Sequence, residues 1–319
     1  MNQSNDALLE ELRPRAFAIA YRMLGSVAEA EDVVQEALLR VNTALEGGER
    51  LESPRAYVAT ITTRLAIDEL RSARVRRETY VGEWLPEPIV VDTREDPARQ
   101  AEMADSLSLA FLVLLENLSP EQRAALLLHD VFEYDYAEIA RIIGKSEDNA
   151  RQLATRARRH VDEGKPRFEA SKEKREELAG RFFAAARQGD MKALEALLAE
   201  DVVLKGDGGG KAPAIARSLH GRDRVARTLR NWAKTGWALP NLTIQPVEVN
   251  GQPGALFVDE NGAVFSAMAV DIADGRVQGI NSVVNPDKLR HLGEVGDAWA
   301  LLEQVRQRKQ GERRPGLSR

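Results

Sequence analysis

One stretch, residues 119–161, decides the fold of this chain: SPEQRAALLLHDVFEYDYAEIARIIGKSEDNARQLATRARRHV. Ser119, followed by a proline and then by Gln122 at the third helical position, is the signature of a helix start with a capping box. Asp135 begins a second helix with the same signal, and Gly144 is placed to end it. The stretch therefore predicts two helices and, after a tight turn, a third.

The third helix, predicted for residues 147–161, has small and apolar residues on its inner side and polar residues outside. The outer residues are Arg151, Gln152, Thr155, Arg156, Arg158 and Arg159. Such side chains suit the DNA major groove, because they can donate to base edges and to phosphates. The alternative is an ordinary helical hairpin with a solvated basic face. The coincidence of caps, turn and arginines favours a DNA-binding helix-turn-helix.

Composition limits the remaining possibilities. The chain has 319 residues, which suggests two or three domains. It has no cysteine, which excludes disulfides and thiolate zinc sites and is compatible with a reducing cytoplasm. No apolar run is long enough for a membrane span, so we expect a cytoplasmic protein. We also expect neither a metal nor a cofactor. The net charge of −5 argues against bulk binding of nucleic acid.

Positive charge is nevertheless concentrated in residues 71–77 and 151–159, each with four arginines and no acid. The first run closes a helix that Ser53 and Pro54 start, after a loop containing Gly47 and Gly48. Its polar residues are Arg64, Asp68, Arg71, Arg74, Arg76 and Arg77. A loop beside a basic helix can hold an extruded base and its strand, although a solvated face has the same pattern.

A further helix is predicted after Ser26, which forms a capping box with Glu29. Its outer face carries Asp32, Gln35 and Glu36. This face fits either plain solvent exposure or an acidic docking surface, and spacing alone does not choose between them.

The C-terminal part has a different pattern. Residues 178–198 are helical with a break at Gly189. From residue 242 onward, alternating apolar runs are separated by Asn-Gly, Asn-Gly and Asp-Gly pairs, which are strong hairpin signals. An antiparallel meander that follows helices predicts an α+β domain.

Several sequence strings together resemble the extracytoplasmic-function sigma factors of the SigJ-like subgroup. The strings are AEAEDVVQEA (28–37), WLPEP (84–88), residues 119–161, DGGGK (207–211) and NPDKL (285–289). The C-terminal domain is similar to SnoaL-like members of the NTF2-like fold. The resemblance implies two all-α sigma domains followed by an α+β cone. The implied boundaries are region 2 at 1–80, a proline-containing linker at 81–102, region 4 at 103–165, a linker at 166–176, the SnoaL-like domain at 177–290, and a helix with a basic tail at 291–319.

The resemblance also implies roles for individual residues. Asp32, Gln35 and Glu36 would bind the clamp helices of the largest subunit of core RNA polymerase. Residues 47–53, with the polar residues of the basic helix from Arg64 to Arg77, would hold the melted −10 element. Arg151, Gln152 and Thr155 would face −35 base edges, and Arg156, Arg158 and Arg159 would bind phosphates.

Three strings of the resemblance are expected to form interdomain or regulatory contacts. They contain Trp84, Leu85 and Pro86; Asp207, Gly208, Gly209, Gly210 and Lys211; and Asn285, Pro286, Asp287 and Lys288. Residues 84–85 could either pack on the nearest domain or take part in switching. The glycine string does not have phosphate-loop spacing, so a close backbone approach to another domain is the better interpretation.

The C-terminal cone implies a cavity between sheet and helices, and whether it holds a small ligand is open. His220, Asp271 and Asn281 are its candidate polar groups. Every tyrosine lies at or before Tyr136, so the phenolic donor of a ketosteroid isomerase is absent, and we expect no enzymatic activity. Two alternatives remain: an enzyme whose N-terminal helices target it, and a repressor that binds DNA without polymerase.

Overall fold

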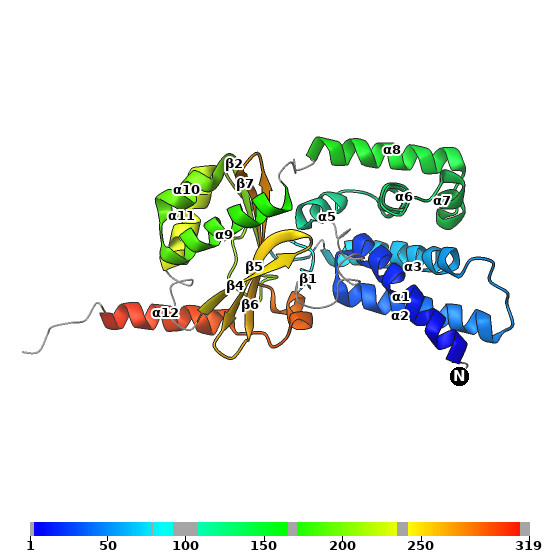
Figure 1. The fold of residues 1–319 in the computed structure, drawn as a ribbon, viewed down its shortest axis with the longest axis horizontal. Helices are drawn as coiled ribbons and strands as arrows, with labels where there is room; N and C mark the ends of the chain where they lie inside the picture. The colour runs from blue at the N-terminus through cyan, green and yellow to red at the C-terminus, as the bar shows by residue number, and fades with distance from the viewer. Residues whose placement is uncertain (1–2, 78, 92–107, 165–170, 235–241, 313–319) are drawn as a thin grey trace, which may run out of the picture. The chain divides into compact units, whose positions relative to one another are not determined.

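The computed structural model describes residues 3–77, 79–91, 108–164, 171–234 and 242–312 (Figure 1). The chain forms two compact units. The first comprises Met1–Thr79 and Asp96–Lys165, and the second comprises Tyr80–Glu95 and Pro166–Arg319. The start of the expected linker, residues 81–91, therefore packs with the C-terminal unit.

The first unit begins with three helices, α1 (Gln3–Leu24), α2 (Val27–Glu46) and α3 (Pro54–Arg77), which pack against one another. Ser26 caps α2, and its Oγ accepts a hydrogen bond from the backbone of Glu29 at 3.2 Å. Ser53 caps α3 in the same way, because its Oγ accepts a hydrogen bond from the backbone N of Ala56 at 3.2 Å. These starts confirm the helix signals in the sequence.

In the described part of the first unit, four more helices follow: α5 (Leu109–Leu115), α6 (Pro120–Asp130), α7 (Tyr136–Ile143) and α8 (Glu147–Gly164). Both capping boxes predicted for the helix-turn-helix are present, at Ser119 with Gln122 and at Asp135 with Glu138. Gly144 ends α7 in the left-handed conformation, with φ of 66°. The predicted helix-turn-helix is confirmed.

The second unit packs α9 (Lys172–Gln188), α10 (Met191–Leu197) and α11 (Arg222–Trp232) against a sheet (Figure 1). The sheet has the order β1-β4-β5-β6-β7-β2-β3. The strands are β1 (Val90–Val91), β2 (Leu198–Asp207), β3 (Leu219–His220), β4 (Leu242–Val249), β5 (Gln252–Asp259), β6 (Val264–Ala273) and β7 (Arg276–Val283). Two short 3-10 helices, η2 (Pro286–Lys288) and η3 (Arg290–Leu292), and α12 (Ala298–Glu312) follow.

The predicted meander is confirmed as β4–β7, with antiparallel pairing throughout. Asn250 and Gly251 turn with φ of 51° and 73°, and Asp274 and Gly275 with 51° and 68°. Positive φ at both central residues matches the tight hairpin turn that such pairs favour. The sequence did not indicate that β2 runs parallel to β7 or that β1 pairs with β4. These pairings join distant segments, which local turn signals do not report.

The two faces of the sheet differ in chemistry. One face packs against the helices through buried apolar side chains, including Phe182, Leu229, Met268 and Ile280. Strand alternation and the pairing register place Asp207, Asn281 and Asp271 together on the opposite face. That face also carries the contacts of residues 80–91 described below.

Candidate functional site

The outer face of α8 is exposed where base contacts were predicted. Gln152 and Thr155 are exposed, and the Thr155 hydroxyl donates to the Arg151 carbonyl at 2.8 Å. Arg151 is also exposed, but its guanidinium is oriented by Glu147 at 2.8 Å and lies 5.2 Å from the Tyr136 ring centre. Its side chain is therefore held in place while its outer edge stays accessible.

Arg158 has a different environment from its neighbours on α8. Its guanidinium donates to both oxygens of Asp130 on α6 and, at 3.3 Å, to the Tyr136 hydroxyl. The Asp130 hydrogen bond raises the pKa of Arg158 above its ordinary value. Arg156 and Arg159 are exposed. Arg158 thus fastens α8 to α6, whereas Arg156 and Arg159 point to solvent.

The basic helix α3 makes contacts with the helix-turn-helix inside the first unit. Arg64 donates to the carbonyls of Arg141 and Ile142, both at 2.9 Å. Those carbonyls lie at the C-terminal end of α7, where helix carbonyls lack intrahelical partners and the helix dipole attracts cations. These bonds fix Arg64 against the end of α7.

Arg71 lies further along α3 and pairs with Asp68 at 3.0 Å and with Glu121 of α6 at 2.7 Å. The hydrogen bond to Glu121 raises the pKa of Arg71. The side chains of the other three predicted contacts, Arg74, Arg76 and Arg77, lie outside the described residues.

The outer face of α2 carries the predicted docking residues. Asp32 and Gln35 are exposed, and Glu36 pairs with Arg40 at 2.7 Å. Leu39 is 59% exposed one turn beyond Gln35, so the face is not purely acidic. Leu39 was not predicted as part of this face; its position four residues after Gln35, outside the apolar face, was the available signal.

In the second unit, Asp207 is the centre of the contacts that hold residues 80–91. Its buried carboxylate accepts from the Tyr80 hydroxyl at 2.5 Å, Leu85 N at 2.8 Å and Gly209 N at 3.0 Å. It also pairs with Lys288 at 2.7 Å. We call Asp207, Lys288, Tyr80 and Leu85 the anchor cluster.

Lys288 extends the anchor cluster to the predicted linker string. Its ammonium donates to the Leu85 carbonyl and lies 4.1 Å from the Trp84 ring centre. Burial, followed by the hydrogen bond to Asp207, raises the pKa of Tyr80 above its ordinary value. Tyr80 was not predicted, because it is an isolated aromatic residue before the proline string. Residues 84–85 were expected either to pack on the nearest domain or to take part in switching. In the structure, Leu85 is buried within the second unit.

The glycine string brings backbone close to neighbouring side chains. Gly209 has φ of 57°, and a Cβ there would lie 2.3 Å from Nδ2 of Asn285. Gly210, with φ of 71°, lies against Val81. Lys211 forms an ion pair with Asp287. The string therefore approaches residues 80–81 and 285–287, which belong to the same unit and not to another domain as expected. Pro286 opens the adjacent 3-10 helix.

The candidate catalytic groups are only partly brought together. Asn281 donates to the buried Asp271 at 2.9 Å, and burial raises the pKa of Asp271 to about 6. His220 is exposed on β3, three strands away from Asp271 in the sheet order. No group of three metal-binding side chains occurs in the described residues. Within the same residues, no helix could span a membrane.

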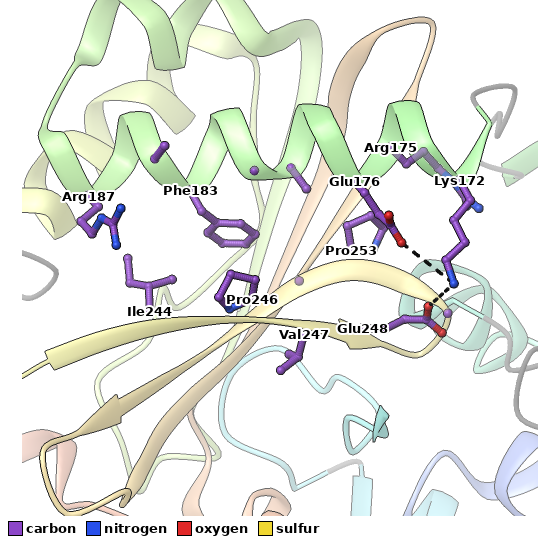
Figure 2. A pocket seen from close by; sticks show the side chains of 15 residues that line it. Lys172, Arg175, Glu176, Phe183, Arg187, Ile244, Pro246, Val247, Glu248 and Pro253 are labelled. Atoms are coloured by element: carbon purple, nitrogen blue, oxygen red, sulfur yellow. Dashed lines mark ion pairs between the residues drawn. The ribbon is translucent and has the colours of Figure 1, made fainter. Parts of the chain in front are cut away.

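A groove lies between α9 and strands β4 and β5 (Figure 2), but none of the candidate polar groups His220, Asp271 and Asn281 lines it. Its volume is about 410 Å³. The deeper region between α9, α11 and the sheet is filled by the apolar core.

Comparisons with known proteins match this architecture part by part. Residues 8–76 match Sigma-70 region 2, residues 108–161 match Sigma-70, region 4, and residues 179–284 match the SnoaL-like domain. The ECF RNA polymerase sigma factor SigJ of Mycobacterium tuberculosis is 39% identical over 288 residues, covering 88% of this chain and 91% of that protein. The probable ECF RNA polymerase sigma factor SigI of the same species is 33% identical, with 87% and 92% covered.

The fold agrees with these sequence matches. The crystal structure of Mycobacterium tuberculosis SigJ superposes with a TM-score of 0.72 and 36% identity, covering 89% of this chain and 98% of that chain. Two sigma regions and a SnoaL-like domain occur in the same order as the predicted strings. The chain belongs to the family of extracytoplasmic-function RNA polymerase sigma factors that carry a C-terminal SnoaL-like domain.

Proposed function

We propose that this chain binds core RNA polymerase and directs it to specific promoters, with its SnoaL-like domain modulating that activity. The observation that carries the proposal is the exposed polar face of α8, held in a capped helix-turn-helix in a member of the sigma family. Such a chain acts in the cytoplasm, and it needs no catalytic step of its own.

Polymerase binding is proposed for the α2 face formed by Asp32, Gln35, Glu36 and Leu39, with the clamp helices of the largest subunit as its target. An exposed leucine among carboxylates and an amide offers both apolar area and polar specificity.

Pull-down of core polymerase at low salt tests the assignment of this face. The Asp32→Ala, Gln35→Ala double variant should bind at least about tenfold more weakly. Asp6→Ala, an exposed acid on α1, is the matched control. Retention of full affinity by the double variant would contradict the assignment.

Promoter −35 recognition is proposed for α8. Arg151, Gln152 and Thr155 face base edges, and Arg156 and Arg159 bind phosphates. Arg158 supports them mainly by fastening α8 to α6. Because Arg151 contacts a base edge, Arg151→Ala should lose more affinity for the cognate element than for random duplex, by about 1–3 kcal/mol. Arg159→Ala should weaken both equally and lower the salt slope by about 1. Equal losses for Arg151→Ala on both duplexes would remove it from the base contacts.

Binding of the melted −10 element is proposed for residues 47–53 with α3. Arg64 and Arg71 have carbonyl and carboxylate acceptors in this structure. Binding a promoter strand would exchange those acceptors for phosphates. Arg64→Gln is expected to lower open-complex formation on a premelted template, measured with core polymerase. Arg55→Gln, an exposed α3 variant, is its control. An unchanged yield for Arg64→Gln would exclude this role.

Modulation by the second unit is proposed to act through the anchor cluster, because it holds the chain segment that connects the two sigma regions. Run-off transcription with core polymerase should differ between the full chain and a chain ending near residue 169. Asp207→Ala, which removes the acceptor for Tyr80 and Leu85, should shift activity in the same direction as the truncation. Identical activity of all three proteins would contradict regulation. We also propose that a small ligand of this domain supplies the signal.

We propose no catalysis for the SnoaL-like domain. Asp271 accepts a hydrogen bond from Asn281 in a buried site, and His220 is on a distant strand. An acid and a base that act on one substrate have to lie within reach of it.

A further inference from the structure

The groove between α9 and strands β4 and β5 has an apolar floor. Phe183 and Ile244 are almost fully buried there, and Pro246 and Pro253 continue the floor along the strands (Figure 2). Its volume of about 410 Å³ lies within the range typical of small-molecule sites. The floor can therefore cover the body of an apolar ligand.

The width of the groove comes from small residues on one face of α9. Ala179, Gly180 and Ala184 line it at helical spacing with Phe183. A Cβ built on Gly180 would have no atom within 4 Å, so the space above that residue is open. Glycine in a helix costs roughly 0.5–1 kcal/mol relative to alanine, and here the absence of a side chain at Gly180 leaves the groove open.

The two ends of the groove differ in charge. At one end Lys172 pairs with Glu248 at 3.1 Å and with Glu176 at 4.0 Å, so both lining carboxylates have a cationic partner. At the other end Arg187 lies beside Ile244 (Figure 2) and has no ion pair among the residues that the structure describes. The groove therefore offers one uncompensated cation next to its apolar floor.

Arg175 lines the same end of the groove as Lys172, so these two cations together offset the charges of the two lining carboxylates and leave Arg187 as the net positive charge of the lining. Arg175 donates to the Gln252 side chain at 3.2 Å, and its buried Nε has no acceptor in the described part of the chain. An anionic ligand is thus favoured over a cationic or neutral one of the same shape. A single arginine, Arg187, at one end of the groove suits a monoanion better than a phosphate with nearly two charges.

We infer that this groove binds an amphiphilic carboxylate. Its apolar body lies along Phe183, Ile244 and Pro246, and its carboxylate lies on Arg187. The inference rests on the proposed binding of a small ligand by the SnoaL-like domain, and it names the chemical class of that ligand.

The test uses the full-length chain without polymerase or DNA, titrated calorimetrically with decanoate below its micellar concentration. We expect saturable binding with one site per chain. Decan-1-ol should bind about tenfold more weakly, because it lacks the charge for Arg187. Butyrate should bind at least about a hundredfold more weakly, because it lacks six methylene groups.

Variants locate the binding within the groove. Gly180→Leu should abolish decanoate binding by filling the open space, while Gly180→Ala should retain much of it and controls for helix propensity. Arg187→Gln should lower decanoate affinity about tenfold and leave decan-1-ol unchanged. Arg181→Gln makes the same change at an exposed site on α9 that does not line the groove, and both affinities should persist.

The inference would be overturned by no decanoate binding, by equal binding of acid and alcohol, or by binding that survives Gly180→Leu. Binding that emerges only after removal of residues 313–319 would assign the groove to the chain's own tail and would also overturn it. Run-off transcription with the truncated chain tests the proposed promoter function separately, so either idea can fail without the other.

Discussion

Each unit buries a basic side chain that joins segments far apart in sequence, and the two side chains differ in the groups that accept their hydrogen bonds. Arg123 of α6 is 2% exposed and donates to the carbonyls of Leu115 and Met23 and to Glu116. Lys288 is 6% exposed and donates to Asp207 and to the Leu85 carbonyl. The Met23 contact spans 100 residues and the Leu85 contact spans 203.

The difference follows from the acceptors. Most acceptors of Arg123 are neutral carbonyls, which a planar fork of donors can satisfy together. Burial lowers the pKa of Arg123 to about 9, so the guanidinium stays charged at neutral pH, where it pairs with the Glu116 carboxylate. Lys288 instead neutralises Asp207, which is completely buried. Removing Lys288 therefore leaves a buried charge, whereas removing Arg123 leaves mainly unpaired carbonyls.

The largest expected effect is that of Lys288→Met. Leaving the Asp207 charge without its partner should cost about 3–5 kcal/mol in the unfolding of the second unit. Urea unfolding followed by tryptophan fluorescence measures this, because all four tryptophans belong to that unit. Lys211→Met removes an exposed ion pair and should cost about 0–1 kcal/mol.

Adding Asp207→Asn to Lys288→Met sharpens that result, because it removes the stranded charge while keeping an acceptor oxygen. The double variant should be more stable than Lys288→Met alone. A double variant that is no more stable than Lys288→Met would show that the unpaired charge of Asp207 does not decide the cost.

Arg123→Met should have a somewhat smaller effect, about 2–4 kcal/mol, since it leaves carbonyls and a partly exposed carboxylate unpaired. The loss should occur in the helical circular dichroism transition of the first unit. Arg55→Met, which removes an arginine with 70% side-chain exposure, is the matched control. The interpretation fails if both variants unfold at the same urea concentration.

Asp271→Asn should stabilise the second unit, and only above acidic pH. The folded pKa of about 6 is higher than the ordinary value of 3.8, so the stability that protonated Asp271 contributes is full below pH 4 and is lost as pH rises through 6. At pH 7.5 the variant should gain roughly 1–3 kcal/mol, and at pH 4 it should match the parent. Unfolding measured at both pH values checks this, and a gain that does not depend on pH would refute it.

The smallest effect is expected from a strictly local change, Ser119→Ala. It removes the acceptor for Gln122 N, which lies at 3.2 Å, and should cost about 1 kcal/mol in the first unit. Ser119→Asp keeps a capping acceptor and should restore most of that loss. If alanine and aspartate behave alike, the cap contributes little here.

Local signals in the sequence correctly predicted much of the fold. Ser119, Asp135, Gly144 and the Asn250-Gly251 turn each act through contacts within four residues, so spacing alone reveals them. The exposed face of α8 was predictable for the same reason, because helical period separates its alanines from its polar residues.

Tertiary contacts of α3 and α8 were not predictable in this way. Arg64 and Arg158 looked like their arginine neighbours in sequence, and only the packing of α7 and α6 against them gave each its acceptors. Leu39 was overlooked because one exposed leucine beside an apolar stripe does not stand out.

The sequence by itself determined the capped helix starts, the tight hairpin turns, the domain types and the family, since these depend on short-range chemistry and on strings of adjacent residues. Tertiary structure alone decided that Asp207 meets Tyr80, Leu85 and Lys288, and that α9 leaves a groove over β4 and β5. Those partners are up to 203 residues apart, and a buried charge or an open space is defined only when distant segments close around it.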